Sequence, residues 1–140
     1  MAFVSITRLR IRSIRFLPAF LVHVLLTLRQ TRAAKGFLGG SLLADRHRAY
    51  WTMTLWTDAE AMRAYMTGGA HRRAMPRLFG WCDEASVAHW EADTLPDWPE
   101  ADRRMRDEGR PSRVRHPTPD HAALAYAAPH VARPVPIRPR

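Results

Sequence analysis

The sequence predicts an α+β protein in which a four-stranded antiparallel sheet carries two helices on one face. Three observations support this prediction. Alternating apolar and polar residues mark strands at both ends of residues 1–91, an apolar segment of helical periodicity follows the first strand, and a polar turn joins two further alternating segments. Together they place the elements in the order βαββαβ.

The first half of this unit reads as a strand, a helix and a hairpin. Residues 2–9 alternate between apolar and polar side chains, which is typical of a strand with one buried face. Residues 17–33 carry leucine and valine at intervals of three and four, which predicts an amphipathic helix. Residues 37–45 and 49–56 are the two strands of the hairpin, and Gly39-Gly40 indicates a bulge or a close approach in the first of them.

The second half begins at Thr57, where Thr57 and Glu60 fit a capping box at the start of a helix. Gly68-Gly69 interrupts this helix, and a second helical piece follows the pair. Residues 84–91 alternate again and complete the sheet. The order of elements is that of the ferredoxin-like fold.

A change of composition near residue 92 separates this domain from a tail. The chain has 140 residues, which is room for one domain, and nine of its 11 prolines lie at or beyond Pro96. We therefore expect a domain over residues 1–91 and a Pro/Arg-rich tail over residues 92–140. The tail is predicted to form a short helix from Trp98 to Arg106 and to be disordered from His116, so that residues 110–140 would be dispensable for folding.

The charge and the apolar content exclude several classes of function. The 22 Lys+Arg residues outnumber the 13 Asp+Glu residues, but no nucleic-acid-binding motif accompanies them, so we expect no nucleic-acid partner. The longest apolar run, residues 16–28, is shorter than the ~20 residues of a span, so we expect no transmembrane segment and a cytoplasmic protein. A helix lying on a membrane surface is the lesser alternative for this run. The single cysteine and the histidine spacing predict no metal site.

One face of the predicted sheet mixes aromatic and hydroxyl side chains. Its members are Phe3, Ser5, Thr7, Tyr50, Thr52, Thr54 and Trp56. Neither solvent nor a purely apolar core suits this mixture, and a ferredoxin-like sheet leaves the face opposite its helices uncovered. We therefore place these side chains on the uncovered face and predict a homodimer whose two sheets enclose a semi-polar cavity for a small-molecule ligand.

The sequence resembles a known superfamily in three features. These are the order of elements, the run Trp56-Thr-Asp-Ala-Glu-Ala-Met at a helix start, and Gly69-Ala70-His71 downstream. They resemble the dimeric α/β-barrel superfamily, and within it the antibiotic-biosynthesis-monooxygenase-like proteins and their uncharacterised relatives. The resemblance covers residues 2–91. It implies a monooxygenase-like protein that acts on a small aromatic or polyketide-like molecule without a cofactor. A non-catalytic ligand-binding or partner protein of the same fold is the alternative.

The same superfamily includes haem-degrading enzymes, which makes haem the second choice of cofactor. Where those enzymes have Asn-Arg-Leu, a tryptophan and a histidine ligand, this sequence has Thr7-Arg8-Leu9, Tyr65 and Met75. A haem ligand would have to shift by one helical turn, to His71.

His71 is the candidate catalytic residue. It follows Gly68-Gly69 at a helix start, where the helix dipole disfavours a protonated imidazole. A neutral imidazole can take a proton from an acidic phenol or enol, as oxygenation without a cofactor requires. The alternative is that His71 only caps the helix. The candidate ligand-binding residues are Thr7, Tyr50, Thr52, Trp56 and Tyr65.

Overall fold

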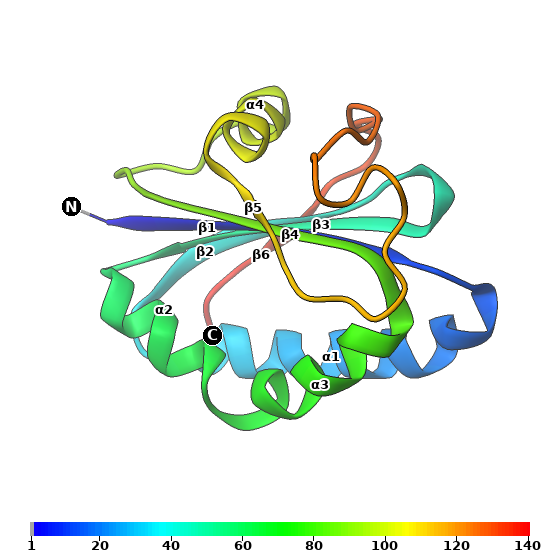
Figure 1. The fold of residues 1–140 in the computed structure, drawn as a ribbon. Coiled ribbons are helices and arrows are strands. Elements are labelled where there is room, and N and C mark those ends of the chain that lie inside the picture. The colour runs from blue at the N-terminus through cyan, green and yellow to red at the C-terminus, as the bar shows by residue number, and fades with distance from the viewer. Residues whose placement is uncertain (1) are drawn as a thin grey trace.

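Six antiparallel strands form one sheet in the computed structural model, which describes residues 2–140 (Figure 1). The strands are β1 (Phe3–Ile11), β2 (Phe37–Ala44), β3 (Ala49–Trp56), β4 (Cys82–Glu91), β5 (Arg110–Pro111) and β6 (Val135–Ile137). Their order is β5-β4-β1-β3-β2-β6. The four central strands have the ferredoxin-like order, and the short strands β5 and β6 extend its two edges, which corrects the predicted count of four.

Three helices cover one face of the sheet and a fourth lies on the other face (Figure 1). Helices α1 (Leu17–Ala33), α2 (Ala59–Met66) and α3 (Gly69–Trp81) form the lower layer, and α4 (Trp98–Glu108) lies above the sheet. Short 3-10 turns, η1 (Ile14–Phe16) and η2 (Arg46–Arg48), precede α1 and β3. No helix among residues 2–140 combines the length and apolar content that crossing a bilayer needs.

The start of α2 differs from the predicted capping box. Asp58, not Thr57, is the N-cap residue, and its carboxylate Oδ1 accepts a hydrogen bond of 2.8 Å from the amide of Ala61. Both residue types cap helices well, so a sequence with Thr57 and Asp58 in succession leaves the register open by one residue. At the start of α4, Asp97 is the N-cap residue and accepts a hydrogen bond from the amide of Glu100. A proline in the first turn, as here, also favours a helix start.

The mixed aromatic and hydroxyl face of the sheet lies against α1, α2 and α3, so its predicted exposure is wrong. Ser5 pairs with Thr54 and Thr7 pairs with Thr52 across β1 and β3, which puts these side chains on one face. Trp56 on that face packs against Met62 of α2. Alternation separates the two faces of a strand, but it does not say which of them meets the helices.

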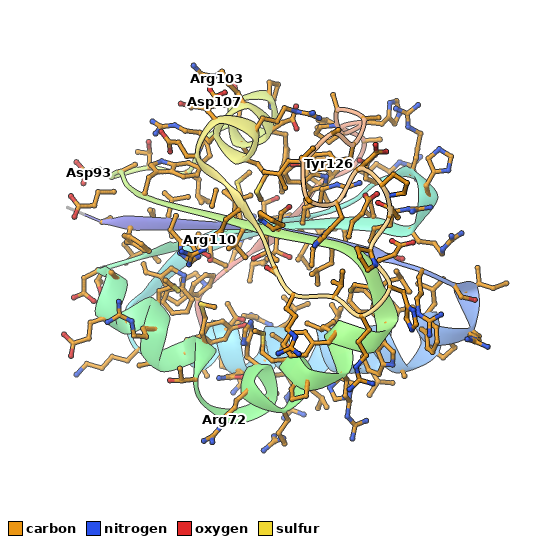
Figure 2. The ribbon with its side chains drawn as sticks, viewed as in Figure 1. Arg72, Asp93, Arg103, Asp107, Arg110 and Tyr126 are labelled. Atoms are coloured by element: carbon orange, nitrogen blue, oxygen red, sulfur yellow. The ribbon has the colours of Figure 1, made fainter. Side chains whose placement is uncertain are left out.

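The opposite face of the sheet is covered by the C-terminal part of the chain. Its buried residues include Val4, Ile6, Trp51 and Met53, and they pack against Trp98, Ala101, Met105, Leu124 and Tyr126. Figure 2 shows Tyr126 above the sheet, on the side that carries α4. The expected disorder from His116 is therefore not what the structure shows. Separated anchor residues hold the segment on a surface that already exists, and such anchors leave no periodic pattern in the sequence.

Buried charge fastens this segment to the sheet. The guanidinium of Arg8 pairs with Glu84 at 2.7 Å and lies 3.8 Å from the ring centroid of Tyr126. The hydroxyl of Thr118 donates to the second carboxylate oxygen of Glu84 at 2.7 Å. Burial alone would raise the pKa of Glu84, but the hydrogen bonds from Thr118 and Arg8, together with the positive charges of Arg8 and Arg10, outweigh it and hold that pKa below its usual value. The tail thus supplies a hydrogen bond to Glu84, from Thr118, and covers Arg8 with the ring of Tyr126.

Candidate functional site

A cavity of about 390 Å³ lies between the sheet and the layer formed by α1, α2 and α3. Its sheet side carries hydroxyl groups of β1 and β3, and its helix side is mostly apolar. The tail contributes wall residues at both edges, Ser112 beyond β5 and Ile137 in β6. The volume falls within the range of small-molecule sites, and the lining is of the apolar kind with a few polar groups that such sites have.

All six residues selected from the sequence line this one cavity. They are Thr7, Tyr50, Thr52, Trp56, Tyr65 and His71. The first four come from the sheet, and the last two come from α2 and α3. They meet because the face that was expected to lie open is the face that the helices cover.

His71 lies at the start of α3 with one ring nitrogen held and the other available. Its Nδ1 lies 3.1 Å from the carbonyl oxygen of Met66, which can only accept, so Nδ1 carries the hydrogen in the neutral ring. Within residues 2–140, Nε2 has no hydrogen-bond partner and keeps its lone pair. Burial lowers the pKa of His71 more than the bond to Met66 raises it. At neutral pH this side chain is an uncharged base.

Tyr65 links His71 to the aromatic wall. Its ring centroid lies 5.0 Å from that of His71 and 5.0 Å from that of Trp56. Its hydroxyl lies 2.7 Å from Thr31 Oγ1, which also lies 2.8 Å from the carbonyl oxygen of Thr27. Burial raises the pKa of Tyr65 to about 12, against the opposing effect of the Thr31 bond, so the residue is a neutral phenol. The ring of Tyr65 is tilted by 33° from that of Trp56 and by 54° from that of His71, and Trp56 is fully buried. Tyr65 and His71, which are half-buried, are therefore the two rings of this row that a ligand in the cavity can contact.

Gln30 of α1 is a part of the site that the sequence reasoning missed. Its Oε1 accepts from the amide of His71 at 2.8 Å, and its Nε2 donates to the carbonyl oxygens of Tyr65 and Gly68 at 3.0 and 2.8 Å. Gly69 has φ +56°, and a Cβ there would lie 3.1 Å from the Gln30 amide. The amide therefore joins α1 to the end of α2 and the start of α3. The signal in the sequence was the polar pair Gln30-Thr31 near the end of an apolar helix.

Other chemically reactive side chains lie outside this arrangement. His89 pairs with Ser5 on the same face of the sheet, but it does not line the cavity. Cys82 is fully buried, and burial raises the pKa of its thiol to about 12, so it is not a nucleophile at neutral pH. Among residues 2–140, no three His, Cys, Asp or Glu side chains are grouped to hold a metal ion.

Comparison with known proteins identifies a family for most of the chain. A family model described as a domain of unknown function (DUF3291) matches residues 27–126. A search of curated proteins finds no match.

Solved structures of related fold cover about two thirds of the chain. SnoaB from Streptomyces nogalater, described as a cofactor-independent oxygenase, aligns over 69% of this chain and 97% of its own, at 16% identity and a TM-score of 0.56. An antibiotic biosynthesis monooxygenase aligns over 69% of this chain and all of its own, at 18% identity and a TM-score of 0.58. The protein Rv0793 from Mycobacterium tuberculosis does so at 11% identity and a TM-score of 0.61. At these identities the likeness establishes the ferredoxin-like fold of the antibiotic-biosynthesis-monooxygenase-like proteins.

Haem, the second choice of cofactor, is not supported. At Thr7, Tyr65 and Met75 this chain lacks the residues that the haem-degrading enzymes have at the matching positions, and all three of these residues line the cavity. The differences therefore fall within the site itself.

Proposed function

We propose, from the premise that the chain belongs to the DUF3291 family of domains of unknown function, that its cavity oxygenates a small aromatic or polyketide-like phenol without a cofactor. The observation that carries this proposal is the neutral imidazole of His71, whose Nε2 is free beside the rings of Tyr65 and Trp56. The fold shared with SnoaB supports it.

In the proposed reaction, His71 Nε2 takes the proton of the phenol or enol. The resulting anion is electron-rich enough to pass electrons to O₂. One oxygen atom of O₂ becomes a carbonyl of the quinone product and the other leaves as water, so a phenol with a free ring C–H plus O₂ gives a quinone plus H₂O. The substrate supplies all the electrons. The apolar walls exclude bulk water from the anion, and the half-buried ring of Tyr65 packs against the substrate.

This reaction needs no second copy of the chain. The tail covers the outer face of the sheet and completes the cavity edges, so one chain contributes every residue named above. The homodimer and the cytoplasmic location remain predictions. A non-catalytic binding protein would use the same cavity.

Oxygen uptake with a tricyclic hydroxyanthrone separates the two functions. The wild type should consume O₂ and form the quinone, whereas a binding protein should quench its tryptophan fluorescence with the same molecule and consume none. His71→Asn should lower turnover by at least ~10²-fold, the low end for the loss of a general base. His89→Asn is the matched control, since this histidine shares the sheet face but not the cavity wall. Equal turnover in the two variants would refute the assignment of His71.

A further inference from the structure

The outer surface of α1 is apolar where a surface helix is ordinarily polar. Val22, Leu25 and Leu26 are 56%, 64% and 43% exposed, and Leu21 lies beside them. No charged residue occurs between Leu17 and Leu28. The opposite side of α1 packs on α3 and lines the cavity, so this helix is apolar on both sides. A helix that is apolar on both sides is expected to be covered on both. This one is not long and apolar enough to cross a bilayer.

Positive charge surrounds this apolar surface. Residues 1–44 contain seven Lys+Arg residues and no Asp or Glu. Arg12 and Arg15 lie at the start of the helix with their guanidinium groups over the ring of Phe16, and Arg29 and Arg32 lie in its last turns. The ion pairs of residues 2–140 use other arginines, namely Arg8, Arg10, Arg103, Arg104 and Arg106. The charge around α1 is therefore not balanced within the chain.

A groove beside α1 combines the two properties. It has a volume of about 610 Å³ and lies between α1 and β6. Leu25, Val135 and Ile137 are among its apolar lining residues, and Arg29, Arg32 and Arg138 also line it. The neighbouring helix α3 adds cations and no acid to the same layer, and Figure 2 shows Arg72 projecting from that layer, away from the sheet.

We propose that this face binds an anionic phospholipid membrane, with α1 lying in the plane of the interface. The exposed aliphatic residues enter the boundary between headgroups and acyl chains, and the arginines at both helix ends reach the phosphates. A second copy of the same face is disfavoured, because it would bring the arginines of one α1 against those of another. The inference does not depend on the proposed oxygenation.

Vesicle sedimentation with the full chain tests this proposal. The protein should sediment with vesicles of phosphatidylcholine and phosphatidylglycerol, should not sediment with phosphatidylcholine alone, and should be released by high salt. Arg32→Glu should weaken the partition coefficient by at least about fivefold, since each basic residue near the surface contributes a factor of that order. Arg103→Glu on α4 is the control of equal charge change, and it should bind as the wild type does.

Leu25→Glu tests the apolar part of the face. It should weaken binding by about tenfold or more, whereas Val131→Glu, which changes another exposed apolar residue outside this face, should not. Circular dichroism checks that each variant is folded. The proposal is overturned if the wild type ignores anionic vesicles, if it binds neutral vesicles equally well, or if Leu25→Glu and Val131→Glu behave alike. It is overturned too if the wild type does not bind vesicles and sedimentation equilibrium shows a wild-type dimer that Leu25→Glu dissociates.

Discussion

Replacing Tyr126 by alanine tests whether the C-terminal segment is part of the folded core. The side chain is 6% exposed, its ring centroid lies 5.9 Å from that of Trp51, and the guanidinium of Arg8 lies 3.8 Å from it. Truncation of a buried aromatic residue to alanine costs about 3–5 kcal/mol of unfolding free energy. The ring also shields the buried Arg8–Glu84 pair from water. We expect a loss of about 3–4 kcal/mol, and a fall of the melting temperature by roughly 10 °C for a domain of this size.

Urea denaturation followed by tryptophan fluorescence measures this loss. Tyr126→Phe is the matched control, because it keeps the ring and its contacts with Trp51 and Arg8, and it should lose less than about 1 kcal/mol. Removal of residues 110–140 should destabilise the protein at least as much as Tyr126→Ala does. If both the truncation and Tyr126→Ala leave the unfolding free energy within about 1 kcal/mol of the wild type, the segment does not pack on the sheet and the argument is refuted.

Three further outcomes are expected. Burial lowers the pKa of His71, so below pH 6.5 the unfolded chain binds more protons at this residue than the folded protein does. The contribution of His71 to stability is therefore full above pH 6.5 and is lost as the pH falls toward the lowered pKa. Urea denaturation repeated across this pH window should show a smaller loss of stability in His71→Asn than in the wild type. Gly69→Ala should cost about 1–2 kcal/mol, because φ is +56° and the new methyl would press on Gln30, whereas Gly80→Ala, with open space around its Cβ, should gain a few tenths to about 1 kcal/mol; thermal melts of the pair decide this. Cys82 should not react with a thiol reagent at neutral pH until urea unfolds the chain, and rapid reaction in the folded state would contradict its burial.

The residues selected from the sequence line one cavity, but the sequence placed that cavity on the wrong side of the sheet. Tyr50, Thr52 and Trp56 were selected because aromatic and hydroxyl groups together suit a semi-polar cavity, and all of them line one. Their face was misassigned, since an alternation of period two distinguishes two faces without orienting either. The more apolar face, with Val4 and Trp51, needed a cover as well, and the helices could have supplied it equally well on sequence grounds.

The packing of the tail and the hydrogen bonds of Gln30 could not be predicted, for the same reason. Both depend on contacts between residues far apart in the chain. Leu124 and Tyr126 are single apolar residues among prolines and alanines, and only the shape of the sheet surface gives them a binding place. Gln30 matters because Gly69 lets the chain approach its amide, and neither residue indicates the other in a periodic pattern. Local rules predict elements well and tertiary anchors poorly.

The covered sheet face changes what a dimer of this protein can be. The prediction from sequence paired two open faces that carry Ser5 and Thr54, but these residues lie beneath the helices. The other face is closed by α4 and by the segment around Tyr126. A barrel made from two sheets would therefore require this segment to leave, at the cost of the aromatic and charged contacts of Trp98, Tyr126 and Arg8. Those contacts lie within one chain, so they form at any protein concentration, whereas the population of a sheet-to-sheet dimer increases only as the protein concentration rises. Self-association through the sheet is thus opposed by the chain's own tail.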